Sequence, residues 1–124
     1  MAWTYEVPTG SFGHNGVLIG RGYSGCGEGL NNVAYEQDKD VGPIPRGQWM
    51  IGDFFDDDGG KGPVVAHLTP FAETDTLNRD GFMIHGDNEA MDHTASHGCI
   101  ILDRAVRDQI TASFDRVLVV TGDN

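Results

Sequence analysis

Positive charge is scarce in this sequence of 124 residues. Only 8 Lys and Arg stand against 19 Asp and Glu, which gives a formal net charge of -11 at pH 7. A surface with that excess of acid repels nucleic acid and anionic lipid, so both are excluded as electrostatic partners. The same charge argues against general adsorption to an anionic cell envelope, so an enzyme acting there needs delivery or a specific groove.

Long apolar runs and cysteine are also missing or rare. No stretch of about 18 apolar residues is present, so we expect no insertion into a membrane. The first ten residues, MAWTYEVPTG, lack the basic and apolar regions of a classical signal peptide, which predicts synthesis in a cytoplasm without one. Cys26 and Cys99 are the only cysteines, too few for a disulfide framework in a domain of this size. The length predicts a single domain over residues 1–124.

Glycine, by contrast, is abundant, with 18 residues, and this excludes a long helical bundle. One helix is expected late in the chain, because Val106, Ile110 and Phe114 recur every four residues and Asp103 precedes them as an N-cap. We predict a mainly β fold, a small antiparallel sandwich or barrel with one late α-helix. The expected strands cover residues 3–7, 16–23, 48–55, 63–68, 81–85, 99–102 and 116–121.

The stretches that carry chemistry are Phe-Met-Ile-His-Gly-Asp-Asn at 82–88 and Thr-Ala-Ser-His-Gly-Cys-Ile at 94–100. An apolar strand delivers His85 at its end, and Cys99 enters a second apolar strand. If the two strands pair antiparallel, the two side chains lie at neighbouring ends and can meet. The joint pattern is more specific than either residue alone, because a lone cysteine is usually a structural residue.

A thiol beside an imidazole can act as a nucleophile. The imidazole lowers the pKa of the thiol from about 8.5 to roughly 3.5–7.5, and can later protonate a leaving amine. Gly98 lets the backbone turn tightly beside Cys99, and the amides of these two residues are candidates to face an oxyanion. Ser96 is a candidate to orient a histidine. His85 is the expected base, with His97 as the alternative.

These motifs resemble the L,D-transpeptidase (YkuD-like) family, in which His-Gly, a spacer and Ser/Thr-His/Arg-Gly-Cys follow one another. The similarity is greatest to the L,D-transpeptidase effectors delivered by type VI secretion systems, and extends over about residues 5–110. Those effectors share features with Gly-Tyr-Ser-Gly at 22–25, Asn-Asn at 31–32, Gly-Pro-Ile-Pro-Arg-Gly at 42–47, Arg79, Ile-His-Gly-Asp at 84–87 and Ser-x-Gly-Cys-Ile at 96–100.

The resemblance implies a β-rich fold and a cysteine L,D-carboxypeptidase or L,D-transpeptidase acting on peptidoglycan without a cofactor. Cys99 then attacks the bond after the third residue of a stem peptide, with Ser96, His97 and Gly98 around it and His85 as base. Arg79 is a candidate partner for a stem carboxylate or, alternatively, a structural ion-pairing residue. The other expected substrate contacts are Tyr23, Arg46, Gly86, Asp87 and Asn88.

The spacer between the two motifs, residues 87–95, is shorter than in the larger transpeptidases. A shorter spacer suggests a more open site, where water competes better with an acceptor amine. Two settings fit such an enzyme, both requiring action in the bacterial periplasm or cell wall. One is an effector injected into a rival, with a cognate immunity protein and a delivery machinery as partners; the other is a phage lysis enzyme.

Two other classes of function stay open. A zinc-dependent peptidoglycan hydrolase would draw its ligands from His67, His85, Asp87, His93 and His97. The sequence His-Glu-x-x-His is absent, since Thr94 follows His93, and we expect no metal. A non-catalytic phage or secretion component with the same fold is the other class. We interpret His14 and His93 as solvated loop residues and Cys26 as an inert small residue.

Overall fold

The computed structural model describes residues 2–57, 62–87 and 96–122. Within these ranges the chain forms ten strands, two short 3-10 turns and one α-helix, α1 (Arg104–Ala112). The 3-10 turns are η1 (Gly27–Gly29) and η2 (Val33–Tyr35). The strands are β1 (Trp3–Glu6), β2 (Ser11–His14), β3 (Val17–Arg21), β4 (Tyr23–Ser24), β5 (Gly47–Ile51), β6 (Phe55–Asp57), β7 (Gly62–Pro70), β8 (Met83–His85), β9 (Ile100–Ile101) and β10 (Val117–Thr121).

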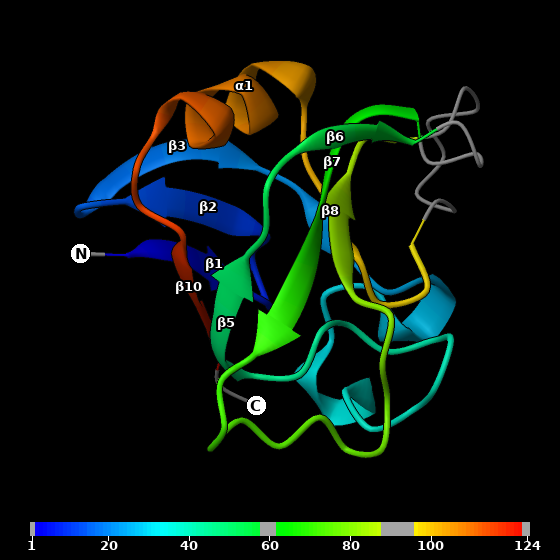
Figure 1. Ribbon diagram of the computed structural model, residues 1–124. Coiled ribbons are helices and arrows are strands. Elements are labelled where there is room, and N and C mark those ends of the chain that lie inside the picture. Colours follow the sequence, from blue (N-terminus) through cyan, green and yellow to red (C-terminus); the bar gives the residue numbers. More distant parts are fainter. Residues whose placement is uncertain (1, 58–61, 88–95, 123–124) are drawn as a thin grey trace.

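The strands form one strongly curved sheet in the order β3-β2-β1-β10-β5-β7-β8-β9-β4, with β6 paired to β7 (Figure 1). The first and last strands of that order, β3 and β4, are consecutive in the chain, so the sheet nearly closes on itself. Gly22 makes the connection. A Cβ atom at Gly22 would lie 2.0 Å from the carbonyl oxygen of Ile101, so only glycine fits there. The predicted mainly β, barrel-like fold with one late helix is confirmed.

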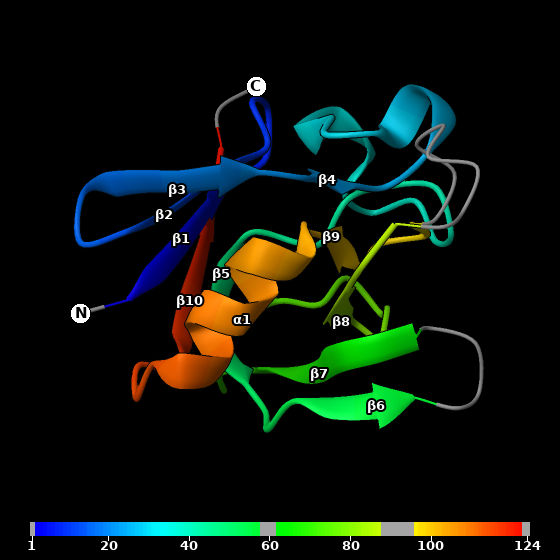
Figure 2. The ribbon, with the colours of Figure 1, turned by 90° about the horizontal axis from the view of Figure 1, so that it is seen from above.

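Apolar residues alternate along the strands and fill the interior of the curved sheet. On β1, for example, Trp3 and Tyr5 are buried while the residues between and after them are exposed. Helix α1 contributes Val106 and Ile110 to the same core and lies over the space that the sheet encloses (Figure 2). The helix begins after Asp103 as predicted, although the Asp103 side chain makes no capping hydrogen bond.

Three details of the predicted elements are wrong. Strand β2 was not expected, although Asn15 and Gly16, both at positive φ, form the turn of a β2–β3 hairpin and are a strong hairpin signal. The helix ends at Ala112, and Phe114 is fully exposed instead of extending the apolar row. The expected strands 16–23 and 48–55 are each interrupted, the first at Gly22.

The described residues include no helix long and apolar enough to cross a membrane.

Candidate active site

The two strands that carry the candidate base and nucleophile are neighbours, but they pair parallel, with Ile84 opposite Ile100 and His85 opposite Ile101. The predicted antiparallel pairing is therefore wrong. A connection of about a dozen residues or more allows a chain to return to the start of a parallel strand, and residues 86–99 are long enough. The alternation of the side chains alone does not distinguish the two directions.

The parallel register places His85 opposite Ile101, two residues after Cys99. Ile84 and Ile100 both belong to the core, and Cys99 directly precedes Ile100 at the start of β9. The sulfur of Cys99 lies 3.8 Å from the carbonyl oxygen of Gly81. The pairing of β8 with β9 therefore brings the segment that carries Cys99 beside the strand that ends at His85.

His85 is held in one tautomer. Its side chain is buried, and Nδ1 lies 2.8 Å from the carbonyl oxygen of Gly86. A carbonyl oxygen can only accept a hydrogen bond, so Nδ1 carries the proton and donates it. The lone pair of the neutral ring then resides on Nε2, the nitrogen that can take a proton from a thiol.

Ser96 organises the turn before Cys99. Its Oγ accepts hydrogen bonds from the amides of Gly25 at 2.8 Å and Gly98 at 3.1 Å, and donates to the carbonyl of Cys99 at 2.6 Å. A serine hydroxyl offers one donor and two acceptor positions, and all three are used. The prediction that Ser96 orients a histidine is therefore wrong, and its hydroxyl instead fixes the backbone of the turn. The Gly98 amide is bound to Ser96 and is not directed at an oxyanion.

Ser24, on β4, was not predicted as a site residue. It is fully buried, donates from Oγ to the carbonyl of Gly98 at 2.9 Å, and accepts from the amide of Ile44 at 2.8 Å. Strand β4 pairs antiparallel with β9, which brings Ser24 beside the turn. A buried serine within a glycine-rich stretch is a signal for such a role, but its partners lie far away in sequence.

Arg79 also holds the turn before Cys99 in place. It is 6 % exposed, and its Nη1 donates to the carbonyls of Glu36 at 2.6 Å and Pro43 at 2.7 Å. Its Nη2 donates to the carbonyls of Gly42 at 3.0 Å and His97 at 3.2 Å. These bonds use all four terminal N–H groups. These contacts are structural, but the partners are four carbonyl groups and not the acidic side chain expected; the contact with a stem carboxylate stays a prediction.

Arg79 also restricts the residue before Cys99. Gly98 has φ +134°, and a Cβ there would lie 2.6 Å from Nη2 of Arg79 and 3.0 Å from the ring of Phe82. Burial lowers the pKa of Arg79, while nearby acidic groups, Cys99 among them, raise it. The guanidinium thus lies close enough to Cys99 for a charge interaction, and a neighbouring cation favours the thiolate form of a cysteine.

His97, the alternative base, is exposed and directed elsewhere. Its Nδ1 lies 3.0 Å from the carbonyl of Asp40 and 3.9 Å from Sγ of Cys26. No imidazole stands near Cys26 in the sequence, since 71 positions separate it from His97, but the fold brings the two side chains together. The interpretation of Cys26 as an inert small residue stays a prediction.

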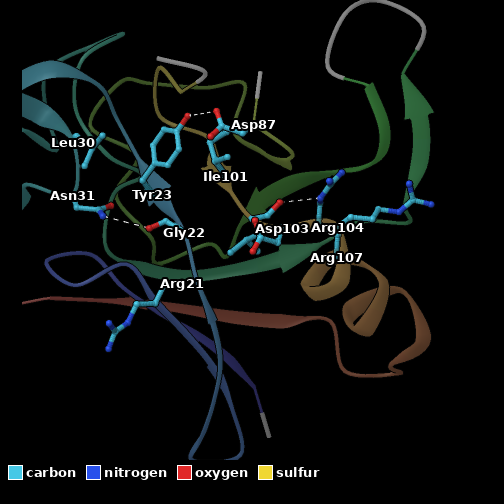
Figure 3. A pocket seen from close by; sticks show the side chains of 11 residues that line it. Arg21, Gly22, Tyr23, Leu30, Asn31, Asp87, Ile101, Asp103, Arg104 and Arg107 are labelled. Carbon is cyan, nitrogen blue, oxygen red and sulfur yellow. Dashed lines mark hydrogen bonds between the residues drawn. The ribbon is translucent and has the colours of Figure 1, made fainter. Parts of the chain in front are cut away.

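The predicted substrate contacts are distributed over different places. Tyr23 donates from its hydroxyl to Asp87 at 2.7 Å, and both residues line a pocket of about 490 Å³ next to β9, with Gly86 beside it (Figure 3). Arg46 lies elsewhere, in a two-point ion pair with Glu36. Asn88 and His93 lie outside the described residues. Among the described residues, no three His, Cys, Asp or Glu side chains gather as metal ligands.

The Glu36–Arg46 pair gives a pH-dependent stability prediction. Burial raises the pKa of Glu36, but the hydrogen bonds and charge of Arg46 outweigh it and hold the pKa below its usual value. A carboxylate with a lowered folded-state pKa stabilises the protein above its unfolded pKa and loses that effect as the pH falls through the folded pKa. We expect Glu36→Gln to cost under about 1 kcal/mol at pH 7, because Arg46 is 40 % exposed.

The cost should vanish as the pH falls below about 4. Urea unfolding of both proteins at pH 7 and pH 3 measures it. Glu73→Gln, at an exposed position, is the control and should change neither value. A cost that is equal at both pH values would show that the pair does not act through the charge of Glu36.

The protein is a small β-barrel with a cysteine directly after a glycine in a turn. The neighbouring strand carries a histidine that is held in one tautomer. These features define a class of candidate thiol enzymes. The chain belongs to the Tlde1 domain family, whose model matches residues 19–121. The match confirms the resemblance to the effector family, while the L,D-transpeptidase assignment stays a prediction. No curated protein matches the chain.

Proposed function

We propose that this chain is a cysteine-dependent L,D-carboxypeptidase that removes the terminal D-alanine from tetrapeptide stems of peptidoglycan. The observation that supports the proposal is the pairing of the strand that ends at His85 with the strand that Cys99 directly precedes, next to a turn fixed by Ser96 and Arg79. Membership of the Tlde1 domain family supports peptidoglycan as the substrate. L,D-transpeptidation is the same chemistry with an amine in place of water.

The reaction follows from the groups present. Nε2 of His85 takes the proton of the Cys99 thiol, and the thiolate attacks the carbonyl carbon of the bond after the third stem residue. The tetrahedral intermediate collapses, the C–N bond breaks, and the imidazolium gives its proton to the departing amine of D-alanine. Water then attacks the thioester, with His85 accepting its proton, and releases the tripeptide and the free thiol.

We further propose that the protein acts as a delivered effector in the periplasm of a target bacterium. The family match favours this setting over a phage lysis enzyme. The net charge of -11 gives no attraction to an anionic envelope, which fits a protein brought to its substrate by other components. An immunity protein that blocks the site would protect the producing cell.

Mass spectrometry of purified muropeptides tests the activity. Disaccharide tetrapeptide should be converted mainly to disaccharide tripeptide, with exchanged or 3-3 cross-linked products in the minority. A chelator should leave the rate unchanged, because no step needs a metal. Cleavage within the glycan, or a rate lost with chelator and restored by zinc, would contradict the proposed chemistry.

A further inference from the structure

The pocket beside β9 lies next to the proposed base. Asp87 follows His85 by two residues, and Ile101 pairs with His85 across the parallel strands; both line the pocket. The N-terminal end of α1 forms the opposite wall. The charged and polar groups that line the pocket are Arg21, Tyr23, Asn31, Asp87, Asp103, Arg104 and Arg107.

Arg107 has an unusual environment for an arginine. Its side chain is only 7 % exposed, and burial lowers its pKa, yet a guanidinium keeps its charge in proteins. Nε donates to the carbonyl of Leu102 at 3.0 Å, and Nη1 donates to the carbonyls of Pro63 at 2.8 Å and Val64 at 3.0 Å. Nη2 has no hydrogen-bond partner in the part of the chain that the structure describes.

That nitrogen lies against the backbone that follows the proposed base. A Cβ placed on Gly86 would come within 2.6 Å of Nη2, so glycine keeps the space between them open. Because the N–H groups of Nε and Nη1 are all used, the two N–H groups of Nη2 are the donors that Arg107 has left for a ligand. A carboxylate oxygen is a strong acceptor for such a charged donor.

The other charged groups of the pocket restrict which kind of molecule could carry a carboxylate to Arg107. Arg104 forms an i,i+4 ion pair with Asp108 on the exposed side of α1, and the Arg21 side chain points away from the rest of the pocket in Figure 3. Asp103 makes no side-chain capping bond. The pocket therefore offers one buried cation together with the acidic groups of Asp87 and Asp103.

We propose that this pocket binds an α-amino acid group with a free carboxylate and a free ammonium, the carboxylate on Nη2 of Arg107 and the ammonium facing Asp103. The site thus deepens the proposed function, on which its biological role rests: the leaving D-alanine, or an amino acid that replaces water, is held beside His85. Recognition of both charges selects a free amino acid over an internal peptide unit.

Titration of the protein with D-alanine, followed by NMR, tests the site without any turnover. D-alanine should bind with a Kd on the order of 1 mM. D-alaninamide, which lacks the carboxylate, and N-acetyl-D-alanine, which lacks the ammonium, should each bind at least about tenfold more weakly. Equal binding of the three compounds, or no binding of D-alanine, would overturn the proposal.

Two variants assign the charges. Asp103→Asn should remove most of the preference for D-alanine over N-acetyl-D-alanine, whereas the matched change Asp108→Asn, on the exposed side of the same helix, should not. Arg107→Lys keeps the charge but loses the Nε and Nη1 bonds that hold Nη2 in place, and should weaken D-alanine binding if the variant is folded by circular dichroism. Unchanged selectivity in Asp103→Asn would refute the placement of the ammonium, whatever the fold of Arg107→Lys.

The outcome separates this proposal from the proposed function. Cys99→Ala should bind D-alanine as the wild type does, since Cys99 does not line the pocket. Binding without stem cleavage would leave the pocket standing and remove the carboxypeptidase activity. Cleavage without D-alanine binding would support the carboxypeptidase activity and overturn the proposed pocket.

Discussion

Replacing Cys99 by alanine is expected to abolish turnover of disaccharide tetrapeptide while leaving a folded protein. The loss should be on the order of 10⁴-fold or more, because removal of a covalent nucleophile leaves only the weak residual effects of binding. Cys99 is partly exposed and does not belong to the hydrophobic core cluster, so the free energy of unfolding should change little. Muropeptide chromatography and thermal unfolding measure the two quantities.

Cys26→Ala is the matched control, since it removes the other thiol of the chain and should keep the activity within a few-fold. His85→Asn should slow alkylation of Cys99 by iodoacetamide at pH 7 by about tenfold or more, since asparagine cannot carry the proton. His97→Asn should have a smaller effect, because His97 contacts Asp40 and Cys26. The opposite ranking of the two histidine variants would assign the base to His97.

Replacing Arg79 by methionine is expected to give the largest loss of stability. Four carbonyl groups would lose their donor, and each orphaned group costs about 1 kcal/mol or more. We expect a loss of at least about 3 kcal/mol, which for a domain of this size lowers the Tm by roughly 10 °C. Thermal unfolding measures the change. Cys99 alkylation should also slow, because the turn and the nearby charge are both lost.

Arg46→Met provides the comparison for Arg79. Arg46 is also an arginine with several hydrogen bonds, but its side chain is 40 % exposed, so its loss should cost under about 1 kcal/mol. Arg79→Lys should recover part of the alkylation rate, because it restores the charge but not all four bonds. Equal Tm values for the Arg46→Met and Arg79→Met proteins would show that Arg79 does not support the turn.

The sequence predicted what depends on local pattern. Alternating apolar residues located most strands, and the spacing of Val106 and Ile110 located the helix core. Cys99 and His85 are candidate site residues because each stands at the edge of an apolar run next to glycine, and their roles stay predictions. These signals are contained within a few neighbouring residues, so no knowledge of the tertiary structure was needed.

The predictions that were wrong or incomplete depend on parts of the chain that are distant in sequence. The direction of the β8–β9 pair is not contained in the alternation of either strand. The partners of Ser96 include Gly25, which β4 brings beside β9, and those of Arg79 come from residues 36–43. The same holds for the contact between Cys26 and His97. In each case the partner lies far away in sequence and could not be predicted from it.

Trapping with hydroxylamine tests most directly the claim that Cys99 forms a thioester with the stem peptide. Hydroxylamine attacks thioesters readily, so a reaction that passes through an acyl-enzyme should yield the tripeptide hydroxamate in place of tripeptide as its concentration rises. The account predicts this product by mass spectrometry with wild-type protein and none with Cys99→Ala. Tripeptide formed at an undiminished rate, with no hydroxamate at any concentration of hydroxylamine, would contradict it, since water would then attack the stem peptide directly.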